Sequence, residues 1–429
     1  MTGFTRWMCV AIASVVLCGC ALALPGTVTT GAARVRQSVA KLAPIYSFRG
    51  SPDGADPIAA MVAPTVGSWT LLGVTYLGGN DNNGLLFGLT ETSDGIWSEQ
   101  VLYKFGGTSH QDGSHPNFVF INPKRRNALD VIVTTYAGGS SNNGTLIELE
   151  PSSKGTWSER FVYSFGGAPD GASPQGLLDE DKRGNLYGTT STGGTGGSGT
   201  VYKMAPTASG YAESVLYNFQ DGADGGVPYG GVILGQKGVL YGTTVTGGSY
   251  AAGTVFALVP SSSGYTERVL YGFAGYPDGA SPYSGLCLDA HGDLFGTTTN
   301  GGTANRGTVF EIIQTSTGTE ERPLWSFHNT GAGSNPYGGV LVSANGTIVG
   351  TTYSGGSRGL GTIFTLEPMH STYVEKDESF TGADGADPYA APFLDRAANL
   401  YATASAGGKL KKGTVVRGGL FHPHCRTTE

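Results

Sequence analysis

Asn185–Thr190 reads Asn-Leu-Tyr-Gly-Thr-Thr, and variants of this stretch return throughout the chain. In one full copy, Leu240–Thr244 is followed by a Gly-Gly pair that begins at Gly247, by the run Gly253–Leu258 and by an aromatic run that ends at Phe273. The runs are four to seven residues long, rich in Val, Leu, Tyr, Phe and Thr, and bounded by Gly, Pro, Asp or Asn. Such short runs are typical of β-strands. The pattern therefore predicts strands, and no helix beyond the first residues of the chain.

The repeat has a nearly constant period. Each copy contains a turn such as Pro277–Pro282, a short apolar run such as Gly285–Asp289, the Asn185–Thr190 element, a Gly-Gly loop, a third run and an aromatic fourth run. Four short antiparallel strands per period are the pattern of a β-propeller blade. The fourth runs end on phenylalanines that lie between 53 and 60 residues apart, namely Phe48, Phe105, Phe165, Phe219, Phe273, Phe327 and Phe380.

The two ends of the repeat region are complementary. Six full periods lie between Phe48 and Phe380, and residues 381–416 then supply three strands without a fourth. The missing strand is Leu42–Phe48. We therefore predict an all-β fold over residues 42–416, a seven-bladed β-propeller of four-stranded antiparallel blades whose ring is closed by the N-terminal strand. This closure hides the sheet edges that an open array exposes. The alternative is an open β-solenoid, which needs no complementary ends.

Composition excludes several classes of protein. The chain has 429 residues, of which 71 are glycine, and charged residues make up only 14%. There is no Gly-X-Y period, so collagen is excluded, and the aromatic content argues against disorder. The net charge of −7 argues against a nucleic-acid partner. After removal of a leader, only Cys287 and Cys425 remain, which is too few for a disulfide framework.

The first residues resemble an export signal. Arg6 precedes the apolar run Trp7–Cys18, and Ala21-Leu22-Ala23 is a small-residue cleavage site. We therefore expect a signal peptide over residues 1–23, a linker over residues 24–41 and a flexible tail over residues 417–429. The predicted location is the periplasm, the extracellular space or the cell surface. Two alternatives remain open, a lipid anchor on Cys20 within a lipoprotein-like box and an uncleaved anchor.

The repeated Leu-Tyr-Gly-Thr-Thr, Gly-Gly and Gly-Thr-Val-Phe elements, with Asp-Gly-Ala-x-Pro between periods, resemble the Gloeo-Verruco tandem repeat, the "choice-of-anchor" GloVer family. The resemblance covers residues 42–416. It is strongest in Gly184–Gly302, and it is weaker where Leu71–Thr75 and Val131–Thr135 replace the tyrosine-glycine version. It implies an exported bacterial repeat protein without a settled activity. Family members often carry a C-terminal sorting segment, and Phe421–Glu429 lacks the apolar character of one.

Two glycine-rich loops are expected on one face of the ring. In an up-and-down blade, the loop between strands two and three and the connection to the next blade emerge on the same side, which we call the glycine-loop face. Each connection carries an Asp-Gly turn, in which the carboxylate binds backbone N–H groups. A ring of cation ligands is the disfavoured alternative, because calcium sites gather several oxygens from one local loop. The turn aspartates are Asp53, Asp112, Asp170, Asp224, Asp278 and Asp384.

Tyrosines are distributed unevenly around the predicted ring. Four consecutive connections place one directly after the turn proline, whereas the first three periods have Ile58, Asn117 and Gln175 there. These tyrosines, Tyr229, Tyr283, Tyr337 and Tyr389, are predicted to form an arc at the mouth of the central channel. A tyrosine ring can stack on a sugar or on a partner surface. The alternative is that each ring only packs on the neighbouring turn.

Five glutamates recur six residues before the closing phenylalanines. They are Glu99, Glu159, Glu213, Glu267 and Glu321. Five identical carboxylates do not make one catalytic pair, because acid and base roles need two different environments. We interpret them as exposed edge charges that oppose aggregation.

No catalytic constellation is evident. The chain contains no H-E-x-x-H motif. The leading hypothesis is an exported, monomeric, non-enzymatic module that binds a carbohydrate or a protein partner on the glycine-loop face. It has no cofactor and no nucleic-acid partner, and it contacts a membrane only through a lipidated Cys20. The alternatives are a polysaccharide-active hydrolase or lyase, since fold does not determine function, and a purely structural surface repeat. An asymmetric cluster of carboxylates or a histidine at the channel would favour the enzyme.

Overall fold

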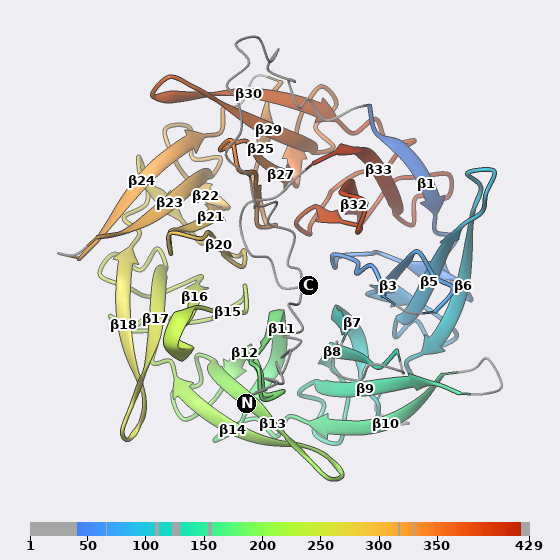
Figure 1. The fold of residues 1–429 in the computed structure, drawn as a ribbon, viewed down its shortest axis with the longest axis horizontal. Coiled ribbons are helices and arrows are strands. Elements are labelled where there is room, and N and C mark those ends of the chain that lie inside the picture. The colour runs from blue at the N-terminus through green and yellow to red at the C-terminus, as the bar shows by residue number, and fades with distance from the viewer. Residues whose placement is uncertain are drawn as a thin grey trace, which may run out of the picture. The chain divides into compact units, whose positions relative to one another are not determined.

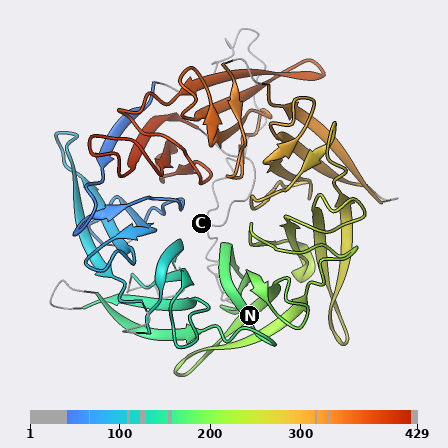
Figure 2. The ribbon, with the colours of Figure 1, turned by 180° about the vertical axis from the view of Figure 1, so that it is seen from behind.

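Figures 1 and 2 show a computed structural model of the chain. The structure describes residues 41–65, 67–107, 111–121, 129–152, 157–315, 318–328 and 331–421. The predicted signal peptide, Cys20, residues 24–40 of the predicted linker and Cys425 lie outside the described residues. Within the described ranges, no helix is long and apolar enough to cross a membrane.

The strands form seven blades that follow one another around a ring (Figure 1). Blade 1 contains β3 (Leu71–Thr75), β5 (Leu85–Glu91) and β6 (Trp97–Lys104); blade 2 contains β7 (Ser114–Ile121), β8 (Val131–Ala137), β9 (Thr145–Pro151) and β10 (Trp157–Ser164); blade 3 contains β11 (Gly171–Glu180), β12 (Leu186–Gly193), β13 (Thr200–Thr207) and β14 (Gly210–Asn218); blade 4 contains β15 (Val232–Leu234), β16 (Leu240–Thr244), β17 (Thr254–Ser261) and β18 (Gly264–Gly272). The first strand of blade 1 is reduced to a bridge between Val62 and Leu72.

The remaining blades complete the ring. Blade 5 contains β20 (Cys287–Leu288), β21 (Leu294–Thr298), β23 (Thr308–Thr315) and β24 (Gly318–Ser326); blade 6 contains β26 (Leu341–Val342), β27 (Ile348–Thr352), β29 (Thr362–Met369) and β30 (Thr372–Ser379); blade 7 contains β31 (Phe393–Leu394), β32 (Asn399–Ala404), β33 (Thr414–Leu420) and β1 (Ala43–Ser47). Short pairs join β2 (Gly54–Ala55) to β4 (Leu77–Gly78), β19 (Gly279–Ala280) to β22 (Asn300–Gly301), and β25 (Gly333–Ser334) to β28 (Ser354–Gly355). The described residues contain one short 3-10 helix, η1 (Gln236–Gly238). First strands surround the ring centre, and fourth strands lie outside (Figures 1 and 2).

The N-terminal strand closes the ring. Blade 7 has the strand order β1-β33-β32-β31, and β1 pairs antiparallel with β33 from Ala43 opposite Arg417 to Ser47 opposite Thr414. This confirms the predicted seven-bladed architecture and its closure. The predicted end of the propeller at residue 416 is too early, because β33 continues to Leu420 and the N–H of Phe421 donates to the carbonyl of Ala398.

The closing phenylalanines hold neighbouring blades together, which explains why they repeat. Phe48 and Phe273 are fully buried. Each ring packs edge-on against an aromatic ring in the third strand of the next blade, with centroids 5.0 Å apart for Phe48 and Phe87 and 5.1 Å apart for Phe273 and Phe310. Edge-to-face pairs at this spacing are favourable beyond the area that they bury.

The two threonines of the repeated element have different partners. The first, such as Thr243, donates from its hydroxyl to the Ser284 carbonyl of the next blade at 2.8 Å. The second, such as Thr244, lies 2.8 Å from the Thr254 hydroxyl of the adjacent strand. The bond from Thr403 of blade 7 to the Ala59 carbonyl of blade 1, at 3.0 Å, crosses the closure of the ring. These buried hydrogen bonds explain why threonine recurs in the second strand.

Gly253 lies where two blades touch, and substitution by alanine should be costly. Its backbone has φ +96°, and an added Cβ would lie 2.4 Å from the Thr244 carbonyl oxygen and 2.6 Å from Pro282 Cδ. Gly292 has φ +95° with no atom within 4 Å of such a Cβ, so it provides a matched control.

We expect Gly292→Ala to cost about 1–2 kcal/mol, the usual penalty of the left-handed region, and Gly253→Ala to cost about 2 kcal/mol more through overlap. Urea unfolding midpoints measure both. Equal losses in the two variants would contradict the contact.

Candidate functional site

The two glycine-rich loops meet on one face, as predicted. The N–H of Gly79, in the loop after the second strand of blade 1, donates to the Asp53 carbonyl at 3.0 Å. Equivalent bonds join Gly194 to Asp170 and Gly302 to Asp278, both at 2.6 Å. The connections between blades are therefore anchored to the Gly-Gly loops before they turn toward the ring centre.

The residue before each turn proline adopts the same unusual backbone in every blade. Its φ lies between +54° and +59° at all seven positions, where residues other than glycine are uncommon. The side chain after the proline is therefore presented in an equivalent way around the ring. The seven residues with this backbone are Asp56, His115, Ser173, Val227, Ser281, Asn335 and Asp387.

The structure brings the four predicted tyrosines into contact. Ring centroids are 5.2 Å apart for Tyr229 and Tyr283, 5.2 Å for Tyr283 and Tyr337, and 4.9 Å for Tyr337 and Tyr389, the last pair being stacked. The Tyr229 side chain contributes to the raised pKa of Tyr389, which places the two near each other, although blade 4 and blade 7 lie three steps apart in the ring. The tyrosines thus form an arc whose two ends approach each other.

Three further tyrosines join this group, and the sequence analysis missed them. Tyr353 lies 5.4 Å from Tyr337 between ring centroids. Burial raises the pKa of Tyr229 to about 12, and Tyr136 and Tyr76 add to the shift, which places both near it. Each of the three directly follows the last threonine of the second strand of its repeat. An alignment of this position across the periods could have predicted them. The tyrosine cluster, as we call it, consists of Tyr76, Tyr136, Tyr229, Tyr283, Tyr337, Tyr353 and Tyr389.

Acidic side chains border the tyrosine cluster on the side of blades 7 and 1. Burial raises the pKa of Asp56, and the charge of Asp387 raises it further. No lysine or arginine of the described residues contributes to the pKa shift of either carboxyl. In blade 2, the His115 ring lies 4.7 Å from the Tyr76 ring, and burial lowers its pKa. These three residues were not predicted from the sequence, although an asymmetric cluster of carboxylates or a histidine at the channel is the feature expected of an enzyme.

The six turn aspartates lie between neighbouring blades. Asp278 accepts hydrogen bonds from the N–H groups of Ala274 at 2.8 Å and Gly279 at 2.6 Å, and from the Tyr271 hydroxyl at 3.0 Å. These contacts have the geometry expected of an aspartate in a turn. In the described part of the chain, no three His, Cys, Asp or Glu residues are grouped so as to hold a metal ion. Backbone N–H groups also donate to Asp53, Asp112, Asp170, Asp224 and Asp384.

The interpretation of the fourth-strand glutamates as exposed charges is wrong for four of the five. Glu267 is half-buried and faces Asp224 and Tyr217 of the preceding connection and blade. Burial and the charge of Asp224 raise the pKa of Glu267 to about 7. Glu159 is exposed, and it still accepts a hydrogen bond from the Tyr103 hydroxyl at 2.6 Å. Burial and the adjacent turn aspartate likewise raise the pKa of Glu99, Glu213 and Glu321 to about 7.

We call each Tyr–Asp–Glu group an interblade acid cluster. The cluster between blades 5 and 6 has a different composition, because Ala332 takes the place of the turn aspartate. Asp377 of β30 replaces that carboxylate and accepts a hydrogen bond from the Gly333 N–H at 3.3 Å. Burial and Asp377 raise the pKa of Glu375 to about 8. A carboxyl pair is therefore kept at this interface by a different route.

The chain is a seven-bladed propeller with tyrosines and acidic side chains gathered on the glycine-loop face. Residues 26–236, 125–330 and 230–418 match the Gloeobacter/Verrucomicrobia repeat, and the chain belongs to this family. The comparison with curated protein sequences found no match.

Solved structures resemble the chain in fold. A putative 6-phosphogluconolactonase from Bacteroides uniformis is 14% identical with a TM-score of 0.50, over 79% of this chain and 94% of that one. A periplasmic gluconolactonase from Pseudomonas aeruginosa is 13% identical with a TM-score of 0.44, over 91% and 98% of the two chains. A putative glucose dehydrogenase from Thermus thermophilus is 15% identical with a TM-score of 0.43, over 71% and 96%. At these identities the likeness concerns the fold alone.

Proposed function

We propose that this protein is an exported, non-enzymatic carbohydrate-binding module whose tyrosine cluster contacts the glycan on the glycine-loop face. The observation that carries the proposal is the contact among Tyr229, Tyr283, Tyr337 and Tyr389, with neighbouring rings 4.9 to 5.2 Å apart. The repeat itself does not require tyrosine at this position, because Ile58, Asn117 and Gln175 occupy it in three blades. The predicted signal peptide supports export.

The chemistry of the mouth suits a sugar. Tyrosine rings present apolar faces to the C–H groups of a pyranose, and their hydroxyls can donate and accept hydrogen bonds. Asp56 and Asp387 add carboxyl oxygens that accept hydrogen bonds from sugar hydroxyls. A few polar groups around an aromatic surface are the usual composition of a small-molecule site.

The second candidate is a polysaccharide-active hydrolase or lyase. It is favoured by Asp56, whose pKa is raised by burial and by Asp387, because acid and base roles need carboxyls in different environments. Its test is release of reducing ends or unsaturated products from polysaccharides. Loss of that activity in Asp56→Asn, with binding retained, would establish the enzyme and overturn the non-enzymatic proposal.

The binding proposal predicts the effect of replacing Tyr229, Tyr283, Tyr337 and Tyr389 together. Replacement by alanine should weaken glycan binding more than tenfold, because it removes several stacking surfaces. Replacement by phenylalanine should retain most of the binding, because the rings remain. A glycan array followed by isothermal titration calorimetry measures both variants.

Thermal melting provides the control for this experiment. If the alanine variant alone unfolds, the rings serve packing, and the more exposed Tyr353 then tests binding through Tyr353→Ala. Full binding by the folded alanine variant would contradict the proposal.

A further inference from the structure

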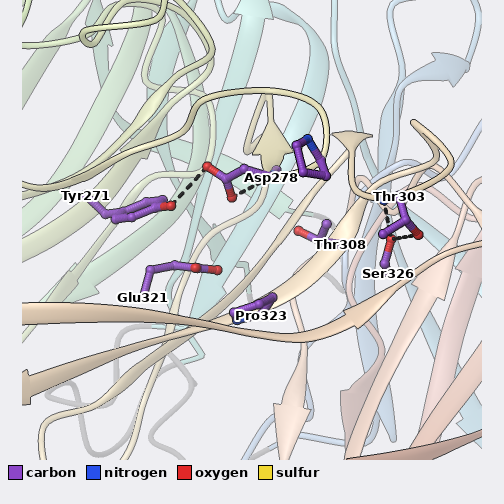
Figure 3. A pocket seen from close by; sticks show the side chains of 9 residues that line it. Tyr271, Asp278, Thr303, Thr308, Glu321, Pro323 and Ser326 are labelled. Atoms are coloured by element: carbon purple, nitrogen blue, oxygen red, sulfur yellow. Dashed lines mark hydrogen bonds between the residues drawn. The ribbon is translucent and has the colours of Figure 1, made fainter.

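A cavity opens between blades 4 and 5, and none of its lining residues belongs to the tyrosine cluster. It has a volume of about 320 Å³ and is lined by residues of β18, of the connection between the blades, of the Gly-Gly loop of blade 5, of β23 and of β24 (Figure 3). Cavities that hold small ligands begin near this size. We call it the rim cleft, because β18 and β24 are fourth strands on the outside of the ring (Figure 1).

The rim cleft carries polar groups on two sides. On one side, the Tyr271 hydroxyl donates to Asp278 at 3.0 Å, and Glu321 lies beside this pair (Figure 3). On the other side, the Ser326 hydroxyl accepts from the Thr303 N–H at 2.8 Å and lies 3.1 Å from the Thr303 hydroxyl. Carboxyl and hydroxyl groups across an otherwise apolar lining can hydrogen-bond a polyhydroxylated ligand.

Two exposed tyrosines adjoin the rim cleft. Tyr276 has an exposed fraction of 72% and directly precedes Pro277, which lines the cleft. Tyr250 has an exposed fraction of 66% and directly follows Ser249, whose backbone nitrogen lies 3.9 Å from the place of a Cβ on Gly272, the residue after the lining Tyr271. Exposed aromatic rings next to a cavity are the usual platforms for stacking a ligand.

The repeat does not demand either tyrosine. Counting from the Gly-Gly pairs, the position of Tyr250 is occupied elsewhere by Asp, Ser, Gly, Ala, Arg and Leu. Ser51 precedes Pro52 and Ala168 precedes Pro169, at the positions that correspond to Tyr276 before Pro277. All seven blades have the same backbone arrangement. An aromatic residue that occurs at one interface only is therefore not required by the fold. Both tyrosines belong to the segments that border the rim cleft.

The rim cleft and the tyrosine cluster are joined by one short connection. Residues 276–283 begin with Tyr276 at the rim and end with Tyr283 in the cluster, so seven residue steps separate the two, at most about 25 Å. We infer that the rim cleft is a second subsite for the same carbohydrate, which is a linear oligosaccharide running from the rim to the channel mouth. This inference rests on the proposed function.

The test uses size ladders of cello-, xylo-, manno- and chito-oligosaccharides from the disaccharide upward, with calorimetry on the full mature chain. The wild type should bind longer members of one ladder more tightly than its disaccharide. The double variant Tyr250→Ala, Tyr276→Ala should bind the disaccharide normally and lose at least tenfold in affinity for the longest member. Leu410→Ala is the matched control, because Leu410 is 55% exposed at the position in blade 7 that corresponds to Tyr250.

Each other outcome is decisive. If the double variant keeps the affinity of the wild type for long chains, or if affinity does not depend on chain length, the rim cleft is not a subsite and the proposed function stands. If the double variant loses the disaccharide as well, without a change in melting temperature, the division into two subsites is wrong. If the wild type binds no ladder, the proposed function fails and this inference fails with it.

Discussion

Deletion of Leu42–Phe48 is expected to abolish the folded state. This segment contains β1, the fourth strand of blade 7, and Phe48, which is fully buried against Phe87 of blade 1. Truncating one buried phenylalanine costs about 3–5 kcal/mol, and the deletion also exposes the edge of β33 and opens the ring. Because whole domains are stable by only about 5–15 kcal/mol, the shortened chain should unfold or aggregate. Circular dichroism melting and size-exclusion chromatography measure this.

Relocating β1 to the other end of the chain tests whether the deletion acts through loss of ring closure or only through the shorter chain. A chain that lacks residues 42–53 at its start and carries them after Phe421 through a flexible Gly/Ser linker should fold, because β1 can then reach β33 from the other end. A deletion variant that melts at the wild-type temperature as a monomer would show that closure by β1 is dispensable. Failure of the relocated strand to restore folding would point to a separate role for the N-terminal connection.

The architecture was predictable because the repeated residues are those that join one blade to the next. Phe273 packs against Phe310, Thr243 bonds the Ser284 carbonyl, and Gly253 adjoins Pro282, so each blade must present the same residues at the same spacing. Because the repeated residues make the contacts between blades, their spacing in the sequence also predicts the number of blades and the closure of the ring.

The misplaced glutamates show where the pattern was insufficient. Glu267 and Tyr271 lie four residues apart, which in a regular strand puts both on one face. The pairing of β17 with β18 changes register between Glu267 and Tyr271. Val255 pairs with Tyr271, whereas the next residue of β17, Phe256, pairs with Val269, so β18 has one extra residue there. Glu267 therefore faces blade 3, while Tyr271 faces Asp278 and blade 5. The bulge is not marked by any residue type, so the sequence did not show that glutamates of one blade meet aspartates of the preceding connection.

The channel mouth could be predicted only in part. The four tyrosines after proline follow the repeat, so their arc was evident. Asp56, His115 and Asp387 occupy a position at which the side chain varies among Asp, His, Ser, Val and Asn, and a search for repeated residues passes over it. Their proximity depends on ring curvature, which brings blades 7, 1 and 2 together after the whole chain has folded.

The protein is expected to become less stable as the pH rises from 5 to 8, because of the interblade acid clusters. Burial and neighbouring aspartates raise the pKa of Glu99, Glu213, Glu267 and Glu321 to about 7, and the pKa of Glu375 to about 8, from an ordinary value of 4.5. The folded state thus holds more protons than the unfolded chain between these values. The contribution of these groups is fully present below pH 4.5 and is lost as the pH passes through about 7 to 8.

The magnitude should be measurable by differential scanning calorimetry. Allowing for partial solvent contact, each glutamate contributes about 1 kcal/mol, so the five together lower the free energy of unfolding by about 5 kcal/mol between pH 5 and pH 8. A melting temperature several degrees lower at pH 8 is expected. His115 acts in the opposite sense, since burial lowers its pKa and its contribution grows with pH, but it is a single group.

Two adjacent residues of β24 provide a matched pair for this prediction. Glu321 faces Asp278, whereas Glu320 lies on the opposite, exposed face of the strand. A glutamine at position 321 cannot ionise. Glu321→Gln should therefore remove about a fifth of the pH dependence of stability and raise the melting temperature at pH 8. Glu320→Gln should change neither. Replacing Glu99, Glu213, Glu267, Glu321 and Glu375 together by glutamine should remove most of the loss of melting temperature in this range. A melting temperature that rises toward pH 8 in the wild type, or a wild-type slope in the fivefold variant, would mean that these carboxyls are ionised in the folded protein and that water reaches the blade interfaces.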